Sequence, residues 1–181
     1  SVFDILKRKA AAGLDVRVMY DDIGSLNTLP FRYYEVIQAA GIKCRVFNPF
    51  RPVAAVRMNN RDHRKIAVID GHTGFTGGIN LADEYINRVE RCGHWKDTAV
   101  MLKGEAVWNL TVMYLQMWNY EIRDETDYLP FGPHVYHPGP FATDGFVQPY
   151  GDSPLDGETV GENIYLNLIN RAKEYVWISS P

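Results

Sequence analysis

The sequence is most distinctive at His63-Arg-Lys65-Ile-Ala-Val-Ile-Asp70, which is followed six residues later by Gly77-Gly78-Ile79-Asn80. The pattern is H-x-K-x4-D-x6-G-G-x-N, so six residue types stand at fixed offsets. Chance agreement at six positions in a chain of this length is on the order of 10⁻⁶. The pattern therefore indicates a functional site.

The local sequence around this motif predicts a β-hairpin. A β-branched run covers 64–70, Asp70-Gly71 is typical of a hairpin turn, and 73–79 is the expected return strand. Because side chains alternate along a strand, His63 and Lys65 are expected on one face and Asp70 on the other. The return strand is expected to bring Asn80 beside His63.

The sequence on either side of the hairpin predicts alternating helices and strands. Apolar residues at helical spacing end at Gly13 and again at Gly41, and a strand-like run follows each glycine. This alternation predicts an α/β fold with a mixed β-sheet flanked by helices. The expected helices cover 2–10, 31–40, 106–120 and 162–175, and the expected strands outside the hairpin cover 15–20, 44–47, 98–102 and 176–180.

Composition limits the class of protein. The chain has 181 residues, of which 46% are hydrophobic and 23% are charged, as in a globular protein. The formal net charge of −3 argues against a protein that coats nucleic acid. Two cysteines, Cys44 and Cys92, are too few for a disulfide framework and favour a reducing compartment. The sequence opens at Ser1 without a methionine, so we expect a piece of a longer chain.

The residue types of the motif suit chemistry at a phosphate. Lys65 supplies positive charge, Asn80 can donate a hydrogen bond, and the neutral imidazole of His63 can attack phosphorus. No carboxylate cluster with metal-ligand spacing accompanies them in the sequence, so we expect neither a metal nor another cofactor. A nucleophilic histidine needs an acceptor for its other ring nitrogen, and Asp97 is the candidate because it precedes the strand expected at 98–102.

Positive charge also gathers around the motif. Such a cluster could attract an anionic lipid headgroup or a nucleic-acid backbone, although a solvated strand edge would look the same. Its members are Arg51, Arg57, Arg61, Arg64 and Lys65.

These residues resemble the HKD signature of the phospholipase D superfamily. The likeness to the bacterial cardiolipin synthase branch extends over nearly the whole chain and includes Gly78 at the second glycine position. It is carried by Asn60-Arg-Asp-His-Arg-Lys65, Thr76-Gly-Gly-Ile-Asn-Leu-Ala-Asp-Glu-Tyr-Ile-Asn-Arg88, Trp95-Lys-Asp-Thr98 and Pro149-Tyr-Gly-Asp-Ser-Pro154.

The resemblance implies a phospholipase D-like sandwich and a transphosphatidylation through a phosphohistidine, in which two phosphatidylglycerol molecules give cardiolipin and glycerol. It implies that His63 and Lys65 act on the phosphate together with Asn80 and Gly78. Asp70 belongs to the same catalytic motif and braces the turn, and Asp97 orients the imidazole. The implied location is the cell membrane, with the catalytic domain facing the cytoplasm.

Members of this family carry two HKD motifs, whereas this chain has one complete motif. We therefore expect half an active site, which would be nearly inactive until a second HKD half or a second copy supplies the general acid. The expected division is a first phospholipase D-like unit at 1–123, a connector rich in proline, glycine and aromatic residues at 124–156, and the start of a second unit at 157–181. The resemblance also implies a first strand of the first unit, which this sequence does not include. Residues 162–180 are expected to fold back into the position of that strand in the sheet.

Two other functions remain open. A dimeric endonuclease or phosphodiesterase of the same superfamily would use the basic cluster, but the net charge and the cardiolipin synthase-like flanks disfavour it. A non-catalytic interaction module would leave Lys65 and Asn80 unexplained.

Overall fold

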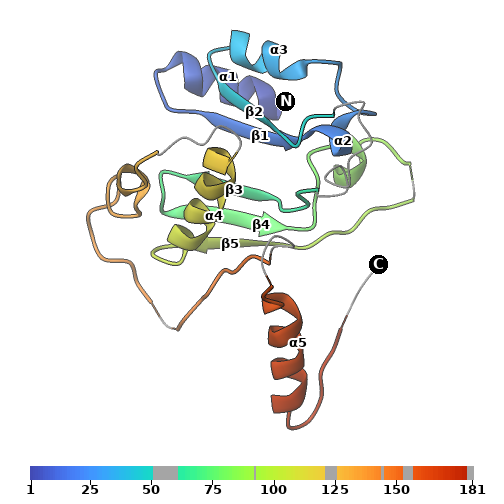
Figure 1. The fold of residues 1–181 in the computed structure, drawn as a ribbon, viewed down its shortest axis with the longest axis vertical. Helices are drawn as coiled ribbons and strands as arrows, with labels where there is room; N and C mark the ends of the chain where they lie inside the picture. The colour runs from blue at the N-terminus through green and yellow to red at the C-terminus, as the bar shows by residue number, and fades with distance from the viewer. Residues whose placement is uncertain (51–60, 92, 121–125, 144, 153–156, 179–181) are drawn as a thin grey trace.

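The computed structural model describes residues 1–50, 61–91, 93–120, 126–143, 145–152 and 157–178. Helices and strands alternate along its first half, with the strands stacked above one another in Figure 1. The described elements are α1 (Val2–Ala11), β1 (Arg17–Asp21), α2 (Asp22–Ser25), α3 (Tyr33–Ala39), β2 (Lys43–Phe47), β3 (Ile66–Ile69), β4 (Thr73–Gly77), β5 (Ala99–Lys103), α4 (Val107–Tyr120), α5 (Val160–Arg171) and the short 3-10 helices Asp83–Ile86 and Leu129–Phe131.

The first two helix–strand repeats end as the sequence predicts. Ser1 caps α1 in a reciprocal capping box with Asp4, which satisfies backbone donors at the start of the helix. Gly13 and Gly41 follow α1 and α3 with φ of +85° and +80°, a left-handed conformation that glycine adopts without steric cost. Each helix therefore stops at its glycine and the chain turns into a strand.

β1 and β2 form a parallel pair, with Arg17 opposite Lys43 at its start. One face of this pair packs against α1 and α3 to make a core around the buried residues Ile37, Ile42 and Cys44. Burial raises the pKa of the Cys44 thiol to about 11, since a thiolate would be poorly solvated there.

The second sheet contains the predicted hairpin. β3, β4 and β5 are antiparallel, and the register pairs Ile66 with Thr76. Asp70 and Gly71 form the turn with φ of +52° and +68°, as required at both central positions of the tight hairpin turns that match strand twist. Asp70 therefore braces the end of the hairpin that is farther from His63.

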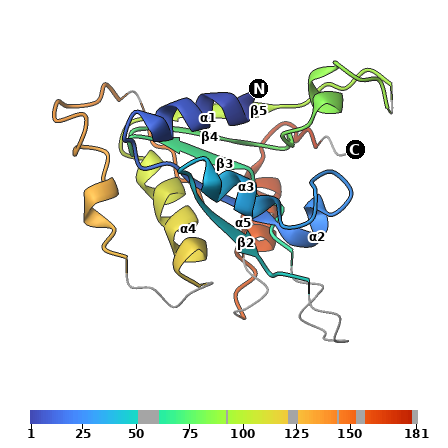
Figure 2. The same cartoon turned by 90° about the horizontal axis from the view of Figure 1, so that it is seen from above.

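Helix α4 covers the hairpin and also reaches the first sheet (Figures 1 and 2). Val107 and Leu110 are buried against β4, where Gly74 allows close approach: a Cβ there would lie 2.8 Å from Leu110 Cδ1. On the other side the Arg45 guanidinium lies 4.0 Å from the Trp118 ring centroid, a cation–π contact that holds α4 to β2.

The predicted C-terminal strand is not observed. α5 has no buried residue, and residues 176–178 pair with no strand, while 179–180 lie outside the described residues. Trp177 is 87% exposed and Ile178 is 67% exposed. β-branched and aromatic residues favour a strand only where a partner edge accepts them. The expectation that residues 162–180 fold back into the sheet is therefore wrong, and Figure 1 shows α5 and the following segment extending away from both sheets.

The predicted fold class is confirmed: parallel and antiparallel strands are flanked by helices in an α/β arrangement. In the described residues the two strand directions belong to two separate sheets, β1–β2 and β3–β4–β5. Across the same residues, no helix has both the length and the apolar character needed to cross a bilayer.

Candidate functional site

The motif residues divide between the two ends of the hairpin. β3 begins immediately after Lys65 and β4 ends at Gly77, so His63, Lys65, Gly78 and Asn80 follow or precede the strands at one end. Continuing the register beyond Ile66 and Thr76 puts His63 opposite Ile79, the neighbour of Asn80. The structure thus brings the predicted phosphate-binding residues to one edge and leaves Asp70 at the other.

His63 presents an accessible imidazole. The residue is exposed, and among the described residues its ring has no hydrogen-bond partner. The Lys65 side chain binds the backbone of the same residue, because Nζ donates a hydrogen bond to the His63 carbonyl oxygen at 2.5 Å. An exposed imidazole and a positive charge therefore belong to one short segment before β3.

Asp97 is engaged elsewhere than at His63. Its Oδ1 accepts from the Thr98 backbone N–H at 2.7 Å, and its Oδ2 accepts from the Trp95 indole N–H at 3.1 Å. The carboxylate lies against Gly78, where a Cβ would stand 2.7 Å from Oδ1. The structure places Asp97 at the correct edge of the sheet, and its role as the orienting carboxylate stays a prediction.

Asn80 lies at the start of the segment that joins β4 to β5, and this segment, called the lobe below, is held together by its own contacts. Asn87 holds the lobe together, since its side chain donates to the Trp95 carbonyl oxygen at 2.8 Å and accepts from the Trp95 N–H at 2.7 Å. The Tyr85 and Trp95 rings pack edge to face with centroids 4.7 Å apart. Figure 2 shows this green segment projecting beyond the ends of the strands. Asn80, at its start, is exposed.

The basic cluster is largely neutralised where the structure describes it. Arg64 binds the Asp62 carboxylate through Nε at 2.9 Å and Nη2 at 2.8 Å. Arg61 pairs with Asp21 at 3.3 Å. Arg51 and Arg57 lie outside the described residues. Of the described members, only Lys65 has no carboxylate partner within the described part of the chain.

Burial and ion pairing oppose each other at Asp62. Burial by itself would raise the pKa of this carboxyl group, but the hydrogen bonds and charge of Arg64, together with Lys65, hold the pKa below its usual value. Asp62 therefore carries a negative charge beside His63 at neutral pH.

Sequence reasoning missed Asp21, the last residue of β1. Its carboxylate accepts the Asp62 backbone N–H at 3.2 Å in addition to the Arg61 guanidinium. An aspartate that ends a strand and precedes a short helix is a sequence signal for a helix N-cap. Asp21 does cap α2, because its side chain accepts a hydrogen bond from the Gly24 N–H at 2.8 Å. Its contact with the motif segment, 41 residues away, had no local signal.

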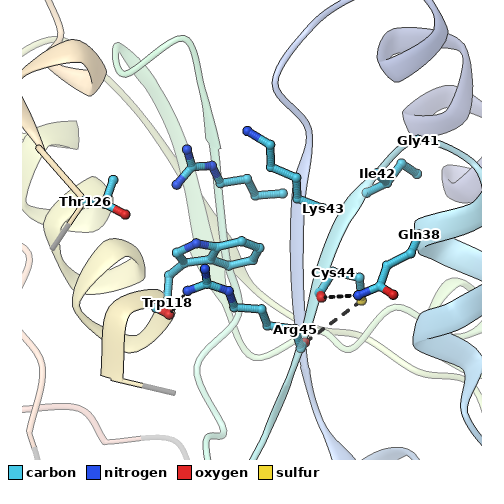
Figure 3. Close-up of a pocket in the computed structure, with 9 residues that line it drawn as sticks. Gln38, Gly41, Ile42, Lys43, Cys44, Arg45, Trp118 and Thr126 are labelled. Carbon is cyan, nitrogen blue, oxygen red and sulfur yellow. Dashed lines mark hydrogen bonds between the residues drawn. The ribbon is translucent and has the colours of Figure 1, made fainter. Parts of the chain in front are cut away.

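A cavity of about 580 Å³ lies away from the motif, between the first sheet and α4 (Figure 3). Asp15 already pairs with two of its cations, Arg17 at 2.9 Å and Lys43 at 3.0 Å. The third, Arg45, lies on the Trp118 ring and donates to the Trp118 carbonyl oxygen. Arg17 and Arg45 both lie over the Trp118 ring and so connect the first sheet to α4. The cavity lining includes no motif residue.

The described residues contain no group of three or more His, Cys, Asp or Glu side chains arranged to hold a metal ion. Metal-independent catalysis stays a prediction.

Comparison with known proteins gives consistent relatives. Residues 1–108 match the family model described as cardiolipin synthase, PLD-like domain. An uncharacterized protein of Streptococcus mutans is 49% identical over 180 residues, which cover 99% of this chain and 38% of that protein. A cardiolipin synthase of Geobacillus thermodenitrificans is 38% identical over 181 residues, 98% of this chain and 35% of that protein.

A third relative, cardiolipin synthase 1 of Bacillus anthracis, is 35% identical over 185 residues, which cover 99% of this chain and 36% of the relative. The chain thus spans little more than a third of the length of these relatives. The family model covers well over half of the chain, including every residue of the H-x-K-x4-D-x6-G-G-x-N motif. The chain therefore belongs to the cardiolipin synthase family of phospholipase D-like domains.

Proposed function

We propose that this chain supplies one half of the active site of a phosphatidyltransferase that makes cardiolipin from two phosphatidylglycerol molecules. The observation that carries the proposal is the exposed His63, with the Lys65 ammonium bound to its backbone carbonyl and Asn80 at the same edge of the sheet, in a member of this family. Relatives named cardiolipin synthase, 35% and 38% identical over nearly the whole chain, support the choice of substrate.

The proposed reaction has two displacements at phosphorus. A ring nitrogen of His63 attacks the phosphodiester of the first phosphatidylglycerol. A P–N bond forms, and the bond from phosphorus to the oxygen of the headgroup glycerol breaks. Glycerol leaves with a proton from a general acid. A hydroxyl of the second phosphatidylglycerol then attacks phosphorus and gives its proton to the conjugate base of that general acid. The P–N bond breaks, so that both His63 and the general acid are restored.

The neighbouring residues have distinct roles in this scheme. Lys65 stabilises the negative charge that builds up on the phosphoryl oxygens, and Asn80 donates a hydrogen bond to one of them. Asp97 accepts a hydrogen bond from the ring N–H of His63, once its carboxylate has exchanged its present donors, Trp95 and Thr98, for the imidazole. Gly78 leaves the space that this carboxylate occupies.

The general acid is proposed to come from outside the described site. The chain has one complete motif, and the scheme needs a second group to protonate the leaving glycerol. A second phospholipase D-like unit of a longer protein, or a second copy of this chain, would supply it. In this proposal residues 1–123 form the first unit, 124–156 connect, and 157–181 begin the second.

The partner is an anionic phospholipid, and the place of work is the surface of the cell membrane, with the catalytic domain on the cytoplasmic side. Nucleic acid is not the proposed partner, because the formal net charge is −3 and the described arginines of the basic cluster, Arg61 and Arg64, pair with carboxylates. The scheme assigns no step to a metal or another cofactor.

The test uses the protein at its full natural length with phosphatidylglycerol vesicles. Cardiolipin and glycerol are measured by mass spectrometry, and an acid-labile phosphatidyl adduct is sought on His63. We expect His63→Ala to abolish product and adduct, and His134→Ala, an exposed histidine at the other end of the hairpin, to retain both. Product formation by His63→Ala, or cleavage of DNA but not of lipid by the wild type, would overturn the proposal.

A further inference from the structure

The side chain of Asp21 is a junction between the two sheets. It is only 10% exposed, and its Oδ1 accepts from Gly24 N–H at 2.8 Å and from Arg61 Nη1 at 3.3 Å. Its Oδ2 accepts from the Asp62 backbone N–H at 3.2 Å. Asp62 is the residue immediately before His63, so the carboxylate binds directly to the backbone that carries the imidazole.

Among the described strands, no backbone pairing joins the first sheet to the second. β1 pairs with β2 and β3 pairs with β4, and no described strand joins β1 to β3. A cavity of about 110 Å³ lies between them, lined by Asp21, Asp62, Arg64 and residues of α4 that include Tyr114. The segment before β3 therefore borders open space, and the Asp21 side chain lines that space beside Asp62.

The other side of His63 is held by a second, local link. The Asp62 carboxylate accepts the Arg64 backbone N–H at 2.9 Å and binds the Arg64 guanidinium through both oxygens. The backbone is therefore fixed before and after His63 while the imidazole itself stays exposed. A nucleophile on a restrained backbone with an open ring is the arrangement that favours a reproducible angle of attack.

We infer that Asp21 is a positioning residue for His63: its carboxylate, at the end of β1, holds the 61–62 backbone so that the imidazole keeps its place relative to Lys65 and Asn80. This inference rests on the proposed function, in which His63 is the nucleophile. Asp21 acts through the backbone and does not touch the reacting atoms.

A purely structural role as the cap of α2 is the competing explanation, and Asp21→Asn separates the two. The asparagine oxygen at the Oδ1 position keeps two donors, Gly24 N–H and Arg61. The amide nitrogen then faces the Asp62 N–H, where two donors cannot bond. The variant thus retains the cap and loses the contact with the motif segment, at almost unchanged volume.

The matched control is Asp15→Asn near the other end of β1. Asp15 also pairs with two cations, Arg17 and Lys43, so this variant removes a carboxylate of comparable connectivity far from His63. Any general loss of stability from breaking ion pairs on β1 is thereby measured independently.

The experiment measures turnover of phosphatidylglycerol vesicles by the full-length protein and amide hydrogen exchange of the 61–65 segment. For Asp21→Asn we expect kcat to fall about 10- to 100-fold with KM within about twofold, since a small misplacement of a reacting group costs this much. Formation of the His63 adduct in rapid-quench samples should slow by the same factor. Exchange in 61–65 should accelerate for Asp21→Asn and stay at the wild-type rate for Asp15→Asn.

The outcomes separate this inference from the proposed function. Unchanged kcat or unchanged exchange in Asp21→Asn would overturn the positioning role, as would an equal loss of kcat in Asp15→Asn. An inactive wild type, or an active His63→Ala, would overturn the proposed function, and the exchange rates would still show whether Asp21 holds the segment.

Discussion

Gly77 and Gly78 are adjacent, yet an alanine at each position meets a different kind of obstacle. At Gly77 the new Cβ would lie 2.6 Å from the Thr98 carbonyl oxygen and 2.8 Å from Ala99 Cα, which are backbone atoms of the neighbouring strand segment. At Gly78 the obstacle is the Asp97 carboxylate, whose Oδ1 would lie 2.7 Å away. A backbone cannot move without weakening the β4–β5 pairing, whereas an exposed carboxylate can swing aside.

The expected free-energy costs follow from these contacts. Overpacking against backbone at Gly77 should cost about 2–3 kcal/mol of unfolding free energy. At Gly78 the displaced Asp97 loses its bonds from Thr98 and Trp95, each worth about 1 kcal/mol net. Alanine returns about 0.5–1 kcal/mol by restricting the unfolded chain. The net cost of Gly78→Ala should therefore be about 1 kcal/mol.

Urea unfolding of the two single variants, each also made in an Asp97→Ala background, measures both costs. The penalty of Gly78→Ala should disappear once Asp97 is removed, and the penalty of Gly77→Ala should remain. If the Gly78→Ala penalty is the same in both backgrounds, the steric reasoning is wrong. If Gly78→Ala also retains full turnover, Asp97 does not orient His63 from its place against Gly78.

Three further predictions concern stability and reactivity. The pKa of Asp62 is lowered in the folded state, so its charged form stabilises the fold at pH values above the ordinary value of 3.8. At pH 7 the unfolding free energy of the wild type should exceed that of Asp62→Asn by roughly 1 kcal/mol. Urea unfolding should show this difference shrinking as the pH falls below 3.8. In a Cys92→Ser background at pH 8, folded protein should react with iodoacetamide at Cys44 at least about 100-fold more slowly than an ordinary thiol does, because burial raises the pKa of Cys44 to about 11 from 9.0. Equal reaction rates in folded and unfolded protein would contradict this burial. Gly71→Ala should lower the unfolding free energy by about 2 kcal/mol, since φ at this residue is +68° and a Cβ would collide with the Phe131 carbonyl oxygen. The variant should also expose residues 129–141 to proteolysis, and an unchanged digest would contradict this packing.

Most of the secondary structure followed from local signals. The glycines after α1 and α3, the Asp70-Gly71 turn and the β-branched run of β3 each act within a few residues, and the structure contains the elements they predict. The C-terminal strand failed because Tyr175 to Ile178 has strand-like residues but no partner edge in the described structure. Strand formation depends on pairing, which a single segment does not encode.

The candidate site divides in the same way. Local sequence was enough to predict which groups stand at the end of the hairpin, because the short-range geometry of one turn and two strands places His63, Lys65, Gly78 and Asn80 there. Three contacts depend on how distant segments pack: Arg61 pairs with Asp21, Asp97 lies against Gly78, and Asp21 binds the backbone beside His63. Those contacts join segments far apart in the chain, and their geometry is set by how the sheets and α4 pack together, which no local pattern of residues specifies.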